Sequence, residues 1–156
     1  MTTHLRSVTE LHELVGTELG TSDWIDIDQA RVDGFADHTE DRQWIHVDPQ
    51  RSTSESPFGG PIAHGYLILS LISAFWEQIL QVDDVTMGVN YGLNKVRFPS
   101  PVPVGSRVRM VASLLTVDTV TGGVHIVLRA TVEAEGITKP VCVAEPVFRL
   151  YRNAFL

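Results

Sequence analysis

An α+β fold, with an antiparallel sheet wrapped around one long central helix, is the fold class that the sequence predicts. Residues 65–80 form the most apolar segment and are hydrophobic nearly all round at helical pitch, which is typical of a helix buried on most faces. Two later runs alternate between apolar and polar residues, as strands with one covered face do. The length of 156 residues suits one compact domain over residues 1–156.

The elements before this helix are expected to be short. Ser7 and Glu10 have the spacing of a capping box, which opens a short helix. Its inward residues are expected to be Val8, Leu11, Leu14 and Val15. Residues 24–27 predict a short strand, and Asp28 then caps a second helix. Residues 37–61 are polar and interrupted by Pro and Gly, which predicts a long irregular loop of the kind that often carries function.

The predicted central helix and the strands after it make up the rest of the domain. At 1.5 Å per residue, residues 65–80 form a helix roughly 24 Å long. The strands are expected over residues 107–114, 124–134 and 141–151, with glycine-containing turns between them. The residues expected on the covered face of the first two are Val108, Met110, Ala112, Leu114, Val124, Ile126, Leu128, Ala130, Val132 and Ala134.

Composition and charge exclude several classes of protein. The formal net charge is −7, which disfavours binding to nucleic acid or to an anionic membrane surface. The longest apolar stretch, residues 66–76, is about half the length that spans a bilayer. Cys142 is the only cysteine, so neither an internal disulfide nor a cysteine-based metal cluster can form. Since residues 1–16 lack the apolar core of a signal peptide, we expect a cytoplasmic protein.

Three short motifs occur in a fixed order around the start of the predicted central helix. Asp41 is followed by His46 five residues later and then by Asp48-Pro49. Residues 62–65 read Ile-Ala-His-Gly, and residues 98–105 have the pattern Phe-x-x-Pro-Val-x-x-Gly. Together these motifs resemble the MaoC-like dehydratases and (R)-specific enoyl-CoA hydratases, and within them the nodulation-protein-N-like branch most closely.

The resemblance implies a single hot-dog fold and a hydro-lyase of fatty-acid metabolism that adds water reversibly to trans-2-enoyl-CoA. The chain departs from the family pattern next to the first motif. A frequent family glycine is Glu40 here, and the family's Asn-Pro before the histidine is Gln43-Trp44. These changes alter the turn chemistry and leave the spacing from Asp41 to His46 intact, so they bear on substrate range more than on reaction type.

Asp41, His46 and Gly65 are the predicted catalytic residues. Hydration of an unsaturated thioester needs a base for water, a proton for the α-carbon and stabilisation of negative charge on the thioester oxygen. An imidazole and a carboxylate on one loop can hold and activate a water molecule between them. Gly65 opens the predicted helix, so its free backbone N–H can bind the developing oxyanion, and a side chain there would obstruct the thioester.

Four further residues are predicted to bind substrate. His64 is one, with support of the loop or capping of the helix as alternatives to direct chemistry. Ser73 matches a position that lines the active site in related hydratases, although helical serines often bond their own backbone. Lys95 and Arg97 are the other two, and with Arg107 and Arg109 they are expected to form a basic cluster that pairs with the phosphates of coenzyme A. The alternative for this cluster is a solvated strand face.

No metal or separate cofactor is expected, because the family reaction needs none and coenzyme A is part of the substrate. The histidines at 46 and 64 also lack an evident third ligand in the sequence. The other histidines have no partner at an informative spacing; they are His4, His12, His38 and His125.

Two other functions stay open at this level. The hot-dog fold also hosts acyl-CoA thioesterases, which generally carry a catalytic carboxylate on or near the central helix. Here that helix has only Glu77, far from Gly65, which favours hydration. A non-catalytic acyl-CoA-binding protein is the other alternative, because fold alone does not fix function. A single hot-dog unit leaves strand edges open, so we expect a homodimer whose sheets join, with acyl-CoA lying across the junction.

Overall fold

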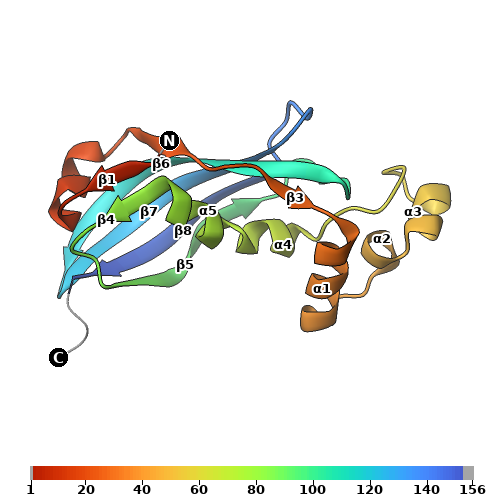
Figure 1. The fold of residues 1–156 in the computed structure, drawn as a ribbon, viewed down its shortest axis with the longest axis horizontal. Helices are drawn as coiled ribbons and strands as arrows, with labels where there is room; N and C mark the ends of the chain where they lie inside the picture. Colours follow the sequence, from red (N-terminus) through yellow and green to blue (C-terminus); the bar gives the residue numbers. More distant parts are fainter. Residues whose placement is uncertain (1, 153–156) are drawn as a thin grey trace.

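An antiparallel sheet forms the main layer of the computed structural model, which describes residues 2–152 (Figure 1). The six strands run in the order β2–β6–β7–β8–β5, and β3 also pairs with β6. Their bounds are β2 (Glu18–Thr21), β3 (Ile25–Ile27), β5 (Met87–Arg97), β6 (Ser106–Val120), β7 (Gly123–Ala134) and β8 (Cys142–Tyr151). The predicted sheet wrapped on a central helix is thus confirmed.

The three central strands follow the predicted alternation. All ten residues expected on the covered face are buried. The register explains how they meet, since Val108 pairs with Ala134 and Met110 with Val132 across β6 and β7. Side chains on opposite residues of neighbouring strands point to the same face, so the apolar sets of the two strands form one surface.

The edge strand β5 was not predicted. Its eleven residues pair only with β8, and the register shifts twice along them. Most of the strand is exposed, including the side chains of Tyr91 and Leu93, so no apolar–polar alternation marks it in the sequence. A strand at the edge of a sheet lacks the two-sided packing that produces such a pattern.

The central helix is divided into α4 (Gly65–Ser70) and α5 (Ile72–Ile79), whereas one continuous helix was predicted. The division falls at Leu71, whose backbone remains in the helical region. Just before it, the Ser70 hydroxyl donates to the carbonyl of Leu67 at 2.7 Å. A serine that bonds its own helix backbone bends the helix, which accounts for the interruption.

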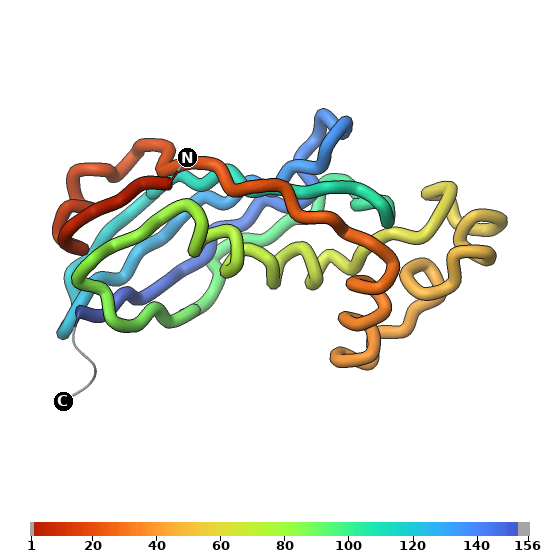
Figure 2. Tube along the Cα trace, in the orientation of Figure 1, coloured from red at the N-terminus to blue at the C-terminus, as the bar shows by residue number. Residues whose placement is uncertain are grey.

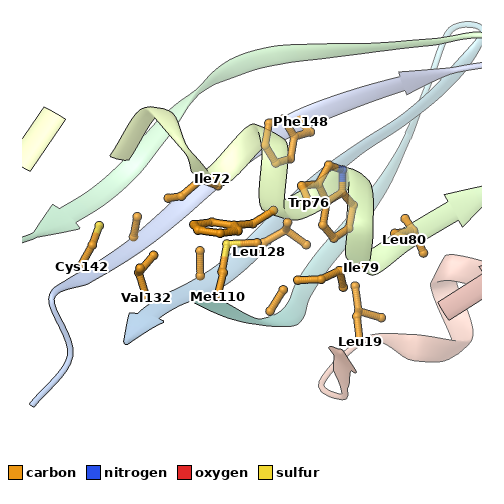
Figure 3. Close-up of a cluster of buried hydrophobic side chains, with 14 of the residues drawn as sticks. Leu19, Ile72, Trp76, Ile79, Leu80, Met110, Leu128, Val132, Cys142 and Phe148 are labelled. Carbon is orange, nitrogen blue, oxygen red and sulfur yellow. The ribbon is translucent and has the colours of Figure 1, made fainter. Parts of the chain in front are cut away.

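The helix packs its apolar face on the sheet and forms the core with it (Figure 3). Phe75 and Ile79 are fully buried, and Trp76 stacks on Phe148 of β8 with ring centroids 5.8 Å apart. The opposite face is open, as Tyr66 is 71% exposed. The expectation of burial on most faces was therefore wrong for one chain, because a single sheet covers only one side of the helix.

The N-terminal segment closes the other end of the core. Strand β1 (Thr3–Leu5) pairs in parallel with β4 (Leu80–Val82), directly after α5. A 3₁₀ helix, η1 (Val8–Leu14), follows, and the predicted capping box between Ser7 and Glu10 is present at its start. Val8 and Leu11 are buried as expected, but Val15 lies outside the helix and is 44% exposed.

Three helices lie beyond one end of the sheet, next to the start of α4 (Figure 2). Helix α1 (Gln29–Thr39) has the predicted N-cap, as the Asp28 carboxylate accepts from Arg31 N–H at 2.8 Å. The segment predicted to be irregular instead forms α2 (Trp44–Val47) and α3 (Pro49–Glu55). No helix in residues 2–152 has the length and apolar character to cross a membrane.

Candidate active site

His46 on α2 is a buried histidine in a defined tautomer. Its side chain is 7% exposed, and Nδ1 lies 2.6 Å from the main-chain carbonyl oxygen of Ile62. A carbonyl oxygen only accepts hydrogen bonds, so Nδ1 must carry the proton. When the ring is neutral, Nε2 therefore has a free lone pair and can accept a proton from water.

His64, the residue before α4, connects His46 to Asp41. It is 2% exposed, and its ring stacks on that of His46 with centroids 3.9 Å apart and planes 25° apart. Its Nε2–H donates to the main-chain carbonyl of Asp41 at 2.9 Å and lies 4.0 Å from the Asp41 carboxylate. His64 is the N-cap residue of α4, but its side chain makes no capping hydrogen bond and contacts the loop at Asp41 instead, so its role stays a prediction.

The second and third sequence motifs are paired in space. Ala63 N–H donates to the carbonyl of Val102 at 2.8 Å, and Val104 N–H donates to that of Pro61 at 2.9 Å. Ile62 N–H donates to the carbonyl of Ile45, next to His46. These bonds place the segment before α4 between α2 and the chain that enters β6, so all three motifs converge on one region.

A cavity of about 310 Å³ lies at this convergence, and both His46 and Gly65 line it. Its wall is mostly apolar and includes the half-exposed rings of Phe58 and Phe98. A Cβ on Gly65 would stand 3.0 Å from the Phe98 ring, so this ring would have to shift by a few tenths of an ångström to admit a side chain. The first N–H groups of a helix have no acceptor within it, so Gly65 presents a donor at this wall.

Burial lowers the pKa of His46 from its usual value, because the charged ring loses solvation. The hydrogen bond to the Ile62 carbonyl opposes this, the imidazole of His64 lowers the pKa further, and the Asp41 carboxylate raises it. The net effect is a ring that stays neutral at neutral pH. A neutral imidazole with a free Nε2 is the form that a general base requires.

Asp41 stands beside the cavity rather than in its wall. Its side chain is 49% exposed, and it is not among the residues that line the 310 Å³ space. A carboxylate oxygen of Asp41 and the imidazole nitrogens of His46 and His64 nevertheless lie within 4.8 Å of one another. The loop therefore brings the predicted carboxylate to the predicted base.

The same three residues bear on the metal prediction. The argument that the histidines lack a third ligand was wrong, since Asp41 supplies a carboxylate oxygen at this distance. The stack of the two rings works against joint coordination, because parallel rings direct their in-plane lone pairs side by side rather than toward one point. The expectation that the reaction uses no metal stays a prediction.

Ser73 is not brought to this cavity. It lies on α5 and lines two other spaces, of about 420 and 260 Å³, together with Asn90 and Phe148. The physical reason is distance along the helix, since eight residues after Gly65 correspond to about 12 Å. Its role in binding substrate remains a prediction.

The predicted basic cluster does not form. Lys95 and Arg97 lie on β5, whereas the other two arginines lie on β6, with β7 and β8 between. Three strand spacings amount to about 14 Å. The β6 arginines also have acidic partners, as Arg107 donates to Glu135 at 2.9 Å and Arg109 approaches Glu133 at 3.5 Å. Arg97 directly precedes Phe98 in the chain, but neither Arg97 nor Lys95 is among the residues that line the cavity.

Several residues of the site were missed at the sequence level. The carbonyl of Ile62 fixes the His46 tautomer, and the ring of Phe35 packs 4.9 Å from that of His64. A main-chain acceptor leaves no signal in a sequence. Phe98 did carry a signal, because it belongs to the third motif, but nothing in the pattern shows that its ring would lie against Gly65.

Known proteins provide an independent comparison. A family model described as MaoC like domain matches residues 10–136. 3-hydroxyacyl-thioester dehydratase Z of Mycobacterium tuberculosis (strain CDC 1551 / Oshkosh) is 50% identical over 144 residues, which are 92% of this chain and 95% of that protein. Nodulation protein N of Rhizobium meliloti (strain 1021) is 48% identical over 147 residues, covering 90% and 89% of the two chains.

Solved structures agree on the fold. The R-hydratase of Pseudomonas aeruginosa in its unliganded form matches with a TM-score of 0.71 at 23% identity, over 91% of this chain and 86% of that one. The architecture is the single hot-dog fold that the motifs implied. By the extent of the family match and the identity to its relatives, this chain belongs to the MaoC-like family.

Proposed function

We propose that the protein is an (R)-specific enoyl-CoA hydratase, which in reverse is a (3R)-3-hydroxyacyl-CoA dehydratase of fatty-acid metabolism. The observation that carries this proposal is the shared cavity: His46 and the N–H end of α4 at Gly65 line one space, and Asp41 stands beside it. The relative in Mycobacterium tuberculosis, half identical to this chain, is named a 3-hydroxyacyl-thioester dehydratase. That name supports the same reaction type here.

The reaction can be written with these three residues. Nε2 of His46 takes a proton from a water molecule that the Asp41 carboxylate also holds, and the water oxygen bonds to C3 of the enoyl group. The electron pair of the double bond moves toward the thioester oxygen, where Gly65 N–H stabilises the negative charge. The proton held on His46 Nε2 then passes to C2, which restores the thioester and the neutral imidazole and leaves the hydroxyl on C3. Dehydration follows the same steps in reverse.

The acyl part and the carrier of the substrate have different candidate contacts. The apolar cavity wall with Phe58 and Phe98 suits the acyl group. Coenzyme A carries phosphate charges, and Arg97 and Lys95 on the neighbouring edge strand are the cations nearest this wall in sequence. We propose that they bind these phosphates, and that the protein acts on acyl-CoA in the cytoplasm.

A homodimer is part of the same proposal. The strand β5 leaves one edge unpaired in the described chain, and the open face of α4 exposes Tyr66 next to it. A second copy that adds its own β5 would extend the sheet and cover this apolar face. The proposed partners are therefore the acyl-CoA substrate and a second copy of this chain, and neither nucleic acid nor a membrane is among them.

A thioesterase reaction has less support. Its expected carboxylate on the central helix would be Glu77, which lines a different cavity with Ser73 and Trp76. Among the described residues that line the His46 cavity, none is acidic. A purely binding role has no specific feature in its favour, because the base, the carboxylate and the N–H donor are all present.

Hydration of crotonyl-CoA tests the proposal. Loss of the enoyl absorbance should be catalysed by the wild type, with (3R)-3-hydroxybutyryl-CoA as product. Asp41→Asn and His46→Gln should each lower the rate of hydration about 10²–10⁴-fold. Both variants should remain folded, as judged by circular dichroism. His38→Gln, which changes an exposed histidine of α1, should match the wild type. Release of free coenzyme A without loss of the enoyl chromophore would instead establish a thioesterase.

We also propose that the reaction needs no metal ion or added cofactor. The chemistry of water addition is proton transfer and charge stabilisation, and the residues described above supply both. Dialysis against EDTA should therefore leave the rate of crotonyl-CoA hydration unchanged. A loss of rate that added Zn²⁺ or Mg²⁺ restores would contradict this and would direct attention to Asp41, His46 and His64 as ligands.

A further inference from the structure

His64 contacts the two residues to which the proposed function assigns proton transfer, His46 through its ring and Asp41 through its main chain. Its Nε2–H bonds the Asp41 main chain at 2.9 Å, and its ring stacks on that of His46 at 3.9 Å. The ring of Phe35 from α1 packs against it as well, at 4.9 Å. His64 is 98% buried and is absent from the cavity wall, so it reaches the substrate only through its neighbours.

We propose that His64 is a positioning residue, which holds the Asp41 main chain through Nε2–H and the plane of the His46 ring through the stack. The inference rests on the proposed function of this site. From the sequence, His64 was expected to contact substrate, support the loop or cap the helix, and the inference adds a hold on the His46 ring. The buried Nε2–H of His64 bonds the main-chain carbonyl of Asp41, and this bond restricts the motion of the loop at Asp41.

Both contacts act on geometry that proton transfer needs. The Ile62 carbonyl fixes one edge of the His46 ring through Nδ1, but a single hydrogen bond leaves the ring free to tilt about it. A second ring at 3.9 Å removes that freedom. Asp41 has a partly exposed side chain and only a weak contact of its own, from Gln43 N–H at 3.5 Å, so His64 is its main anchor.

The stack also places a second titratable ring against the proposed base. The titratable groups that face His46 are His64 from the start of α4, which lowers the His46 pKa, and Asp41 from the loop, which raises it. Charged groups on the two neighbouring helices have other partners: Asp33 with Gln29 on α1, and Arg51 with Glu55 on α3. Removal of the imidazole at 64 should therefore change the titration of His46 in a known direction, upward.

Two substitutions separate the two contacts. His64→Phe keeps a ring against His46 but has no donor for the Asp41 carbonyl. His64→Gln has an amide N–H in place of Nε2–H but no ring. His12→Gln, at an exposed histidine of η1, is the control for loss of a histidine elsewhere.

We expect kcat for crotonyl-CoA hydration to fall about 10²-fold in His64→Phe and about 10-fold in His64→Gln, with KM changed less than about twofold. The acid limb of the kcat/KM profile should move to higher pH in both variants. An NMR titration of the His46 ring, recorded without substrate, should show the same upward shift, and His12→Gln should show none of these changes.

Two results would overturn the inference. One is a wild-type rate and pH profile in both variants. The other is a loss of kcat that matches the loss of folded protein, with the titration of His46 unchanged, since that pattern belongs to a merely structural residue. If the wild type itself does not hydrate crotonyl-CoA, the proposed function fails, while the NMR titration still decides whether His64 acts on His46.

Discussion

At the scale of single residues, the site depends on small features with large consequences. Gly65 is the clearest case, because its missing side chain lets the Phe98 ring lie directly against the start of α4. Its backbone does not need the left-handed conformation, so the requirement for glycine there is one of space. The sequence motif contains Gly65, but only the folded structure shows that the Phe98 ring occupies the space beside it.

Gly65→Ala should therefore lower activity with little effect on stability. The added Cβ would meet the Phe98 ring at 3.0 Å and must displace it or the N–H that faces the cavity. We expect kcat for crotonyl-CoA to fall about 10²–10³-fold, as for loss of an oxyanion donor. The matched control is Gly34→Ala in α1, where the Cβ meets open space and the enzyme should keep full activity. Equal activity of the two variants would contradict this role of Gly65.

The pH dependence should report the lowered pKa of His46. The active form is neutral, and burial holds its pKa below the usual value of 6.5, so kcat/KM should keep its plateau to below that pH. The stability of the fold should depend on pH in the same direction. The His46 ring binds a proton more readily in the unfolded chain than in the folded one, so the free energy of unfolding falls as the pH drops below about 6.5. An acid limb at or above pH 6.5 in the wild type would show that His46 is not the base. His46→Gln should remove this contribution to the stability profile.

At the scale of elements, the end of α1 shows how a local departure is accommodated. Glu40 is the C-cap residue and has a φ of 63°, in the left-handed region that favours glycine. This is the position at which the related family frequently has glycine. A non-glycine residue there costs about 1 kcal/mol, and the chain accepts this cost directly before Asp41.

Glu40→Gly should relieve this strain. We expect the free energy of unfolding to rise by about 0.5–1 kcal/mol in urea denaturation, with activity unchanged. Glu40→Ala is the matched control, because it removes the same carboxylate but keeps a Cβ and hence the strained backbone. Equal stabilisation by both changes would mean that the charge of Glu40, and not its φ, is the source of the effect.

The elements differ in how well the sequence predicted them. The caps at Ser7 and Asp28 and the strands β6 and β7 follow from local patterns, since a cap bond spans three residues and an alternating run fixes its own face. The helices α2 and α3 and the strand β5 did not follow. Two short turns of helix have no periodicity to detect, and an exposed edge strand has no covered face.

At the scale of the whole molecule, one face of the chain exposes apolar side chains beside an unpaired strand edge. The open side of α4 and the unpaired edge of β5 present Tyr66 and Leu93, which line one cavity of about 260 Å³ between helix and strand. A single chain thus leaves apolar surface exposed where its sheet could continue. The proposed homodimer accounts for this surface.

Leu93→Lys tests this arrangement. The side chain of Leu93 is 43% exposed on the edge strand, and a charge there should oppose pairing of two β5 strands. Light scattering after size-exclusion should give a dimer for the wild type and a smaller species for the variant. Val15→Lys is the matched control, since Val15 is equally exposed but lies at the end of η1. A monomeric wild type would contradict the proposed dimer.

The fold class, the central strands and the main caps followed from the sequence, which also named Asp41, His46 and Gly65 as candidate site residues, because all of these depend on patterns and motifs local to the chain. The surroundings of these residues became visible only once the chain was folded. The tertiary structure separated the basic residues onto distant strands, put Ser73 in another cavity and stacked His64 on His46. Such contacts join residues far apart in sequence, or use main-chain atoms that every residue has, so no local pattern encodes them.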